Sequence, residues 1–412
     1  MTQDPLALSD ALWRGEIDPG EVNPFSFMGD LTEVAPGIAF VPSFANVTAC
    51  TTGDGLVLVD TGSPMFASAI HQQVRSWSRA PLDTAIYTHG HIDHVFGVAP
   101  FEAEETPRPK VIAHARVPER FRRYELTASY NGLINRRQFG LADLQWPTHY
   151  RYPDETYEDA VELSVGDRTF ALNHGKGETD DATWVWIEDE RVLCCGDFFI
   201  WASPNAGNPQ KAQRYPAEWA EALRAMAELG AEILLPGHGL PIAGADRVRT
   251  ALEDSAELLE SIVSQTLAMI NAGSRLDAIV QTVKAPPHLL GKPYLRPVYD
   301  EPEFVVHNIW RLYAGWYDGD PATLKPPTEA AVASEVANFA GGAAALAKRA
   351  KEVADEGNLR LAGRLAEWAV LADPREDEVR SAHADIYERR AATEASTMAK
   401  GIFSWAASES RS

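Results

Sequence analysis

The sequence contains little cysteine. Its 412 residues include three, Cys50 and the neighbouring pair Cys194-Cys195. So sparse and odd a set is not the disulfide framework of a secreted domain, and it favours a reducing compartment. The N-terminal stretch has neither a basic start nor an apolar run long enough for a signal peptide, so we expect a cytoplasmic protein.

Long apolar runs and positive charge are also lacking. No stretch of about 20 apolar residues occurs, so no transmembrane helix is expected. The 37 Lys and Arg residues stand against 59 Asp and Glu residues, and the net charge is −22. This balance argues against nucleic acid or an anionic membrane as a partner. The hydrophobic fraction of 45% and charged fraction of 23% are those of a globular protein, and the length predicts two or three domains.

The pattern of the chain changes near residue 245. Before it, apolar strand-like runs alternate with helical patterns, and runs at 47–52 and 56–60 flank the turn Gly53-Asp54-Gly55, which predicts a hairpin. After it, helical periodicity dominates, with alanine-rich helices expected near 329–355, 358–372 and 375–407. We therefore predict an α/β domain over residues 1–245 and an all-α domain over residues 246–412.

One segment carries an unusual density of metal-binding side chains: Thr88-His89-Gly90-His91-Ile92-Asp93-His94. It directly follows an apolar run, and neutral imidazole and carboxylate are preferred ligands of zinc and similar divalent metals. In an extended segment residues two apart point the same way, so His89 and His91 can converge on one ion. Asp93 and His94 follow at a turn and can reach a second ion.

Three later segments offer further ligands, and each follows a strand-like run. They are residues 174–179 (HGKGET), residues 194–197 (CCGD) and residues 234–239 (LLPGHG).

Taken in order, these four motifs resemble those of the metallo-β-lactamase-fold hydrolases. The resemblance covers residues 37–243 and implies an αββα sandwich with a two-metal site at one edge of the sheets. It implies that His89 and His91 bind a first metal, that Asp93, His94 and His238 bind a second, and that Asp197 bridges both. The expected cofactors are two Zn²⁺ ions, with other divalent metals as alternatives, and the expected catalytic carboxylates are Asp93 and Asp197.

The third motif departs from the common pattern of that family. Most members place a histidine directly before the threonine of this loop, whereas this chain has Glu178 before Thr179. Glu178 could be a carboxylate ligand in the usual position, or His174 could be a displaced ligand. Alignment on the strand 184–187 and on Asp197 favours Glu178, and His174 is otherwise a loop histidine or a residue behind the ligands.

A glutamate at this position resembles the zinc-dependent alkyl sulfatases. Residues 313–322 (YAGWYDGDPA) resemble a segment of their dimerisation domain, which implies a homodimer formed through the C-terminal helices. We expect no counterpart of their C-terminal sterol-carrier-like domain in this chain. The segment that contacts sulfate in those enzymes, which follows the fourth motif, is also not matched in this sequence.

The resemblance implies a hydrolase that cleaves an alkyl sulfate ester to alcohol and sulfate with a metal-bound hydroxide. The alternative is a carboxylic ester, lactone or thioester hydrolase with the same two-metal site. Either way the partner is a small-molecule ester, anionic in the first case, and guanidinium and ammonium groups are suited to bind its oxygens. Arginines between residues 116 and 137 could do this, or could form a helix face paired to surface acids. The candidate substrate-binding residues are Tyr130, Asn131, Arg136, Lys211 and Arg214.

Overall fold

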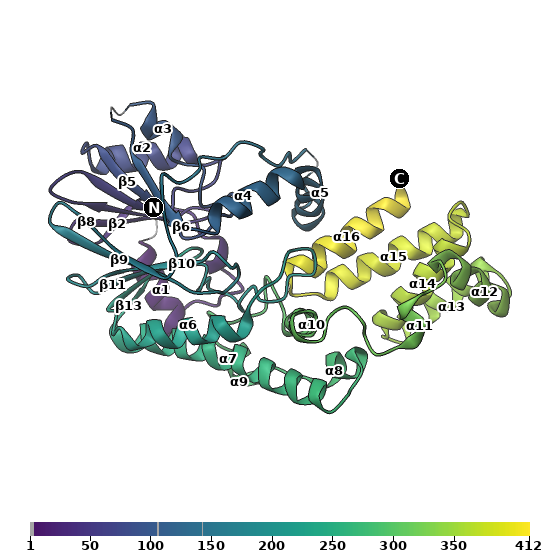
Figure 1. The fold of residues 1–412 in the computed structure, drawn as a ribbon. Helices are drawn as coiled ribbons and strands as arrows, with labels where there is room; N and C mark the ends of the chain where they lie inside the picture. Colours follow the sequence, from purple (N-terminus) through teal and green to yellow (C-terminus); the bar gives the residue numbers. More distant parts are fainter. Residues whose placement is uncertain (1–3, 105–106, 142) are drawn as a thin grey trace. The chain divides into compact units, whose positions relative to one another are not determined.

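The computed structural model describes residues 4–104, 107–141 and 143–412, and these form two compact units (Figure 1). Unit 1 comprises Met1–Ala128 and Pro147–Gly315, and unit 2 comprises Ser129–Trp146 and Trp316–Ser412.

The described part of unit 1 contains a seven-stranded sheet whose strands follow one another in chain order. Its first four strands are antiparallel neighbours, and the later pairings are parallel. The predicted hairpin is confirmed, because Thr51 pairs with Leu56 across the turn. The strands are β1 (Thr32–Ala35), β2 (Ile38–Val41), β3 (Val47–Thr51), β4 (Leu56–Val59), β5 (Leu82–Ile86), β6 (Lys110–His114) and β7 (Glu155–Tyr157).

A second sheet, six-stranded over the residues described, has the order β13-β12-β11-β10-β9-β8. Its pairing of β11 with β12 is parallel and its other pairings are antiparallel. The strands are β8 (Ala160–Val165), β9 (Arg168–His174), β10 (Thr183–Ile187), β11 (Val192–Gly196), β12 (Ile233–Pro236) and β13 (Ile242–Ala243).

The two sheets pack face to face, because Phe40 and Val57 of the first share one buried cluster with Phe170 and Val185 of the second. Helices cover both outer faces, which confirms the predicted αββα sandwich. On the first sheet these are α2 (Ala67–Trp77), α3 (Ala99–Glu102) and α4 (Val117–Leu126). On the second they are α1 (Pro5–Trp13), α6 (Pro216–Glu228), α7 (Ala245–Asn271), α8 (Leu276–Thr282), α9 (Pro287–Leu290) and α10 (Pro302–Tyr313). A short 3₁₀ helix, η1, spans Pro24–Ser26.

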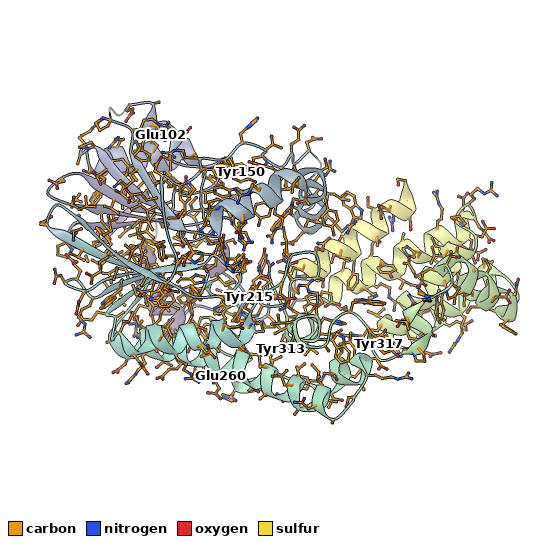
Figure 2. The ribbon with its side chains drawn as sticks, in the orientation of Figure 1. Glu102, Tyr150, Tyr215, Glu260, Tyr313 and Tyr317 are labelled. Atoms are coloured by element: carbon orange, nitrogen blue, oxygen red, sulfur yellow. The ribbon has the colours of Figure 1, made fainter. Side chains whose placement is uncertain are left out.

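The long helix α7 explains where the compact units divide. Its buried residues recur at helical spacing, and Leu252 and Leu259 belong to the same apolar cluster as Leu234 of the second sheet. Glu260 of α7, which Figure 2 labels, pairs with Arg224 of α6 at 2.7 Å. Because α7 to α10 complete the cover of this sheet, the units divide after residue 315, whereas the sequence pattern placed a domain boundary after residue 245.

Unit 2 is helical throughout its described elements. They are most of α5 (Ala128–Phe139), with α11 (Pro321–Leu324), α12 (Glu329–Ala340), α13 (Ala343–Asp355), α14 (Leu359–Ala372), α15 (Asp377–Thr393) and α16 (Thr397–Arg411). Within the described residues no single helix has the length and apolar character to cross a membrane. The pair α12 and α13, bent by 83°, meets that test by length and composition alone.

Two expected helices of unit 2 are each broken in the structure. The expected helix 329–355 divides at Gly341 and Gly342, whose φ angles of 90° and 115° end α12 in a left-handed conformation. The expected helix 375–407 divides before Ser396, whose side chain caps α16 by accepting from the amide of Ala399.

Candidate metal centre

The candidate ligands lie in loops that leave one edge of the sandwich. The segment with His89 to His94 follows β5, Asp197 follows β11, and His238 follows β12 by two residues. The backbone at Gly237 lies very close to the side chain of Asp197. A Cβ atom on Gly237 would overlap Oδ1 of Asp197. The glycine before His238 therefore allows the two loops to meet.

A first group of ligand atoms comes from His89, His91, Glu178 and Asp197, and all of them lie within 4.8 Å of one another. Nε2 of His89 is 2.8 Å from Nδ1 of His91 and 3.6 Å from Oδ2 of Asp197. The ligand atoms of the two histidines thus lie together, in a segment whose residues 88–90 form a bend and not the extended strand that the sequence argument assumed.

A second group consists of Asp93, His94 and His238. Nε2 of His238 lies 3.5 Å from Oδ2 of Asp93 and 3.5 Å from Oδ2 of Asp197, and Nε2 of His94 lies 3.4 Å from Oδ1 of Asp197. Asp197 therefore faces the imidazoles of both groups, which is the position of a bridging carboxylate.

The distances of 3.4 to 3.6 Å that involve Asp93 and Asp197 fit divalent metals, whereas the 2.8 Å between His89 and His91 is a hydrogen-bond distance. Ligand atoms about 2.1 Å from a tetrahedral zinc ion lie about 3.4 Å apart, which is longer than a good hydrogen bond. Within the described residues, buried Nε2 of His94 and Oδ1 of Asp197 have no hydrogen-bond partner. Buried polar atoms are rarely left in this state, and a cation between them would satisfy both. The donor set therefore fits two divalent ions.

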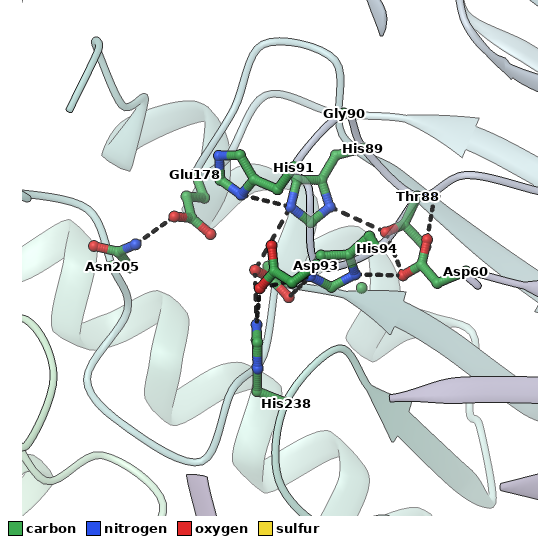
Figure 3. Close-up of polar contacts among 12 residues, drawn as sticks. Asp60, Thr88, His89, Gly90, His91, Asp93, His94, Glu178, Asn205 and His238 are labelled. Carbon is green, nitrogen blue, oxygen red and sulfur yellow. Dashed lines mark hydrogen bonds and ion pairs between the residues drawn. The ribbon is translucent and has the colours of Figure 1, made fainter. Parts of the chain in front are cut away.

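Three of the candidate histidine ligands contact a neighbouring polar group through Nδ1, the ring nitrogen that does not face the other ligands; Figure 3 shows two of these contacts, those of His89 and His94. Nδ1 of His94 lies 2.7 Å from Oδ2 of Asp60, and Nδ1 of His89 lies 3.1 Å from the Thr88 hydroxyl, which donates to the same carboxylate oxygen at 2.7 Å. Nδ1 of His238 contacts the carbonyl oxygen of Phe44. Such contacts orient the rings and leave the other nitrogen for a metal.

A buried ion pair holds the loop between His89 and His91. The amide of Gly90 donates to Oδ2 of Asp181 at 3.1 Å, and Nε of Arg120 donates to the same oxygen at 2.7 Å. Arg120 also pairs with Asp180. This member of the arginine-rich segment is thus buried and paired with acids beside the site.

The third motif brings Glu178 into the first group and leaves His174 outside both groups. His174 is the last residue of β9, where it pairs with Thr183, and its Nδ1 atom lies 2.8 Å from the carbonyl oxygen of Ala182. Its ring stacks on His114 at 3.7 Å. This geometry favours Glu178 as the candidate ligand of this loop.

Burial and charge set the protonation of the site. Burial lowers the pKa of His89 to about 4, and a neutral imidazole is the form that binds a metal. Burial and the neighbouring carboxylate of Asp197 raise the pKa of Glu178 to about 8. Crowded carboxylates of this kind are costly when buried without cations, and two divalent ions would relieve the repulsion.

The candidate substrate residues fall into two sets. Lys211 and Arg214 lie in unit 1, in the loop between β11 and α6, and Nη2 of Arg214 donates to Glu178 at 3.1 Å. Tyr130, Asn131 and Arg136 lie on α5 in unit 2, so their contact with substrate stays a prediction.

Sequence reasoning missed Asp60 and Asn205. Asp60 directly follows the buried strand β4. A polar residue directly after an apolar strand is the same sequence feature that indicated the candidate ligands. Asn205, whose side chain contacts Glu178, lies in a loop that matches no motif, and nothing in its sequence singles it out.

Comparison with known proteins gives two family matches. Residues 41–238 match the model of the metallo-beta-lactamase superfamily, and residues 275–412 match that of alkyl sulfatase dimerisation. A linear primary-alkylsulfatase of a Pseudomonas species is 26% identical, over 82% of this chain and 68% of that protein. An (R)-specific secondary-alkylsulfatase of Pseudomonas is 27% identical, over 87% of this chain and 59% of that protein.

Among solved structures, a double mutant of the sec-alkyl sulfatase PisA1 superposes with a TM-score of 0.84 at 25% identity. The match covers 93% of this chain and 65% of that one. This chain therefore spans 59 to 68% of the length of these relatives.

Proposed function

We propose that this chain, which joins a metallo-beta-lactamase superfamily domain to an alkyl sulfatase dimerisation domain, hydrolyses alkyl sulfate esters to an alcohol and sulfate. One observation carries the proposal. A group of candidate metal ligands that includes the carboxylates Glu178 and Asp197 lies beside a second group, and Asp197 is within 3.5 Å of two imidazoles of that second group. This arrangement occurs in a chain similar to alkylsulfatases over more than 80% of its length.

The proposed cofactors are two zinc ions. His89, His91 and Glu178 would hold one, Asp93, His94 and His238 would hold the other, and Asp197 would bridge them. When bound, two such ions supply hydroxide from water at neutral pH and stabilise negative charge on a leaving group.

Positive side chains beside the site support an anionic substrate. Burial and the cation of Arg214 lower the pKa of Lys211 to about 7, while the carboxylates of Asp93 and Glu178 act in the opposite direction. A bound sulfate group would favour the charged ammonium. Nε of Arg214 is buried without a hydrogen-bond partner among the described residues, so it has a donor left for a sulfate oxygen.

Asp93 is proposed to orient the attacking water and to take up its proton. Its side chain is 20% exposed, compared with 7% for Asp197, so it forms the more open side of the ligand set. Asp197 is proposed to hold the two groups at a fixed spacing.

The decisive experiment combines metal analysis with a substrate panel. Purified protein is loaded with zinc and offered primary and secondary alkyl sulfates, carboxylic esters, lactones and thioesters, and sulfate release is measured. Sulfate release from the alkyl sulfates is expected. Brisk lactone or thioester turnover without sulfate release would overturn the assignment and support the alternative hydrolase.

We further propose a homodimer formed through the helices of unit 2. The match to the dimerisation model supports it, as does Phe339 on α12, which is 92% exposed. A cytoplasmic location is proposed as well, because all three cysteines are buried and form no disulfide in the described part of the chain.

A further inference from the structure

Glu178 is held by two donors on one of its oxygens, and Figure 3 shows the contact with one of them, Asn205. Nδ2 of Asn205 donates to Oε1, and Nη2 of Arg214 donates to the same oxygen at 3.1 Å. All three side chains are buried. With Oε1 engaged in this way, the second carboxylate oxygen remains for the metal group.

Within the described residues, the side-chain amide of Asn205 makes no hydrogen bond other than the one to Glu178. Its Oδ1 atom is buried without a hydrogen-bond partner within the described residues, and the contact with Glu178 is the hydrogen bond that its side chain makes there. A buried amide costs free energy unless it is bonded. The only described contact that offsets this cost is the one with Glu178.

Arg214 is fixed independently of Glu178. Its Nη1 atom donates to the carbonyl oxygen of Ala212 at 2.7 Å. Asn308 of α10 brackets its backbone, because Nδ2 of Asn308 donates to the Arg214 carbonyl at 2.9 Å and Oδ1 accepts from the Arg214 amide at 3.3 Å. These contacts hold the loop that carries Arg214, so its guanidinium is positioned beside residue 178 without help from Glu178.

A histidine at position 178 could not replace these contacts. A neutral imidazole has one acceptor nitrogen, and metal binding would use it. The Asn205 amide would then be buried without a hydrogen-bond partner, and the Arg214 cation would be buried without a carboxylate partner. A buried charge that loses its partner is strongly destabilising.

We infer that Asn205 and Arg214 are positioning residues that fix the Glu178 carboxylate and make this loop require glutamate where a histidine is common. This inference rests on the metal site of the proposed function. It does not depend on which ester that site hydrolyses.

The first test measures metal binding, without any substrate. Arg214→Met and Asn205→Leu remove one donor each, and zinc stoichiometry and affinity are determined by competition with a chelator. Groups behind the ligands contribute about 10- to 100-fold to metal affinity, so each variant is expected to bind the first ion that much more weakly. Arg224→Met is the control, because Arg224 lies in unit 1 and pairs with Glu260 but has no described contact with Glu178, Asn205 or Arg214.

The second test exchanges the ligand. Glu178→His is expected to lose one bound ion per chain. The triple variant that adds Arg214→Met and Asn205→Leu no longer contains the buried cation and amide that lost their partner. It is expected to bind two ions per chain again. A purely structural role for Arg214 would not give this rescue. Circular dichroism and thermal melts establish that each variant is folded before its metal content is compared.

The outcomes separate this inference from the proposed function. Wild-type zinc affinity in Arg214→Met and Asn205→Leu would overturn it, as would two tightly bound ions in Glu178→His alone. A Glu178→His variant that is folded but not rescued would also count against it. If the wild-type protein binds two ions but releases no sulfate, the proposed function fails while this inference stands.

Discussion

Nδ1 of His94 lies 2.7 Å from Oδ2 of Asp60, which is 34 residues earlier in the chain. Both side chains are almost fully buried, and the other oxygen of Asp60 accepts from the backbone amide of Thr88 at 2.7 Å. Asp60 itself has a φ angle of 57°, in the left-handed region. One carboxylate at the end of β4 thus anchors both the start and the end of the histidine-rich loop.

Asp60→Asn is expected to weaken zinc binding by about 10- to 100-fold, because the amide is uncharged and supports the His94 imidazole less well. Metal competition assays measure this directly. Asp83→Asn is the control, since Asp83 is an exposed residue of the neighbouring strand β5. Equal zinc affinity in Asp60→Asn and the wild type would show that this contact does not support the site.

Asp93→Ala is expected to abolish ester hydrolysis and to remove one of two bound ions. The change deletes a carboxylate that lies 3.5 Å from Nε2 of His238 and 3.8 Å from Nε2 of His94. Activity and metal content are measured on the same sample. Normal turnover in this variant would refute the two-metal proposal.

Removal of metal is expected to destabilise unit 1. A chelator leaves Nε2 of His94 and Oδ1 of Asp197 buried without partners. An ion present at 100 times its dissociation constant stabilises the folded state by about 2.7 kcal/mol, so the melting temperature should fall on chelation and recover when zinc is added. A melting temperature unchanged by chelation would show that the folded protein binds no metal tightly.

Stability is expected to fall in mild acid because of His114. Burial, together with the stacked His174 ring, lowers its pKa to about 4, against about 6.5 in an unfolded chain. Below pH 6.5 the unfolded state binds this proton and the folded state does not, so stability falls from about pH 6.5 towards pH 4 and is unaffected above that range.

Urea unfolding at several pH values tests the His114 prediction. His114→Asn keeps an acceptor near the Arg116 amide and removes the titrating group, so its stability should fall less between pH 6.5 and 4. The exposed His288→Asn is the control. If His114→Asn and the wild type lose stability equally, the effect comes from other groups.

Phe339→Ser is expected to weaken self-association by tenfold or more, because it removes the exposed aromatic ring of α12. Sedimentation at micromolar concentrations measures the dimer fraction. Leu126→Ser on α4 is the control, since Leu126 is also exposed but lies in unit 1. A dimer of unchanged affinity in Phe339→Ser would place the interface elsewhere.

The sequence alone determined the mixed strand and helix pattern before residue 245 and the order of the metal motifs, and the family resemblance carried by those motifs implied the αββα class. Strand periodicity and turn residues are local properties, and so is the two-residue spacing that brings His89 and His91 together. The helical periodicity after residue 245 did not indicate that α7 to α10 cover the second sheet. An amphipathic helix shows that it has an apolar face, but not which surface that face covers.

Motif alignment in the sequence already favoured Glu178 over His174, and the tertiary structure supplies the physical reason. The two residues are four apart, and the choice depends on where β9 ends and on the direction in which each side chain leaves the backbone. His174 is still in the sheet and contacts Ala182, whereas Glu178 is in the loop and reaches Asn205 and Arg214. Asn205 and Arg214 lie 27 and 36 residues from Glu178 in sequence, so no local pattern could pair them with it, and only folding brings their donors to the carboxylate.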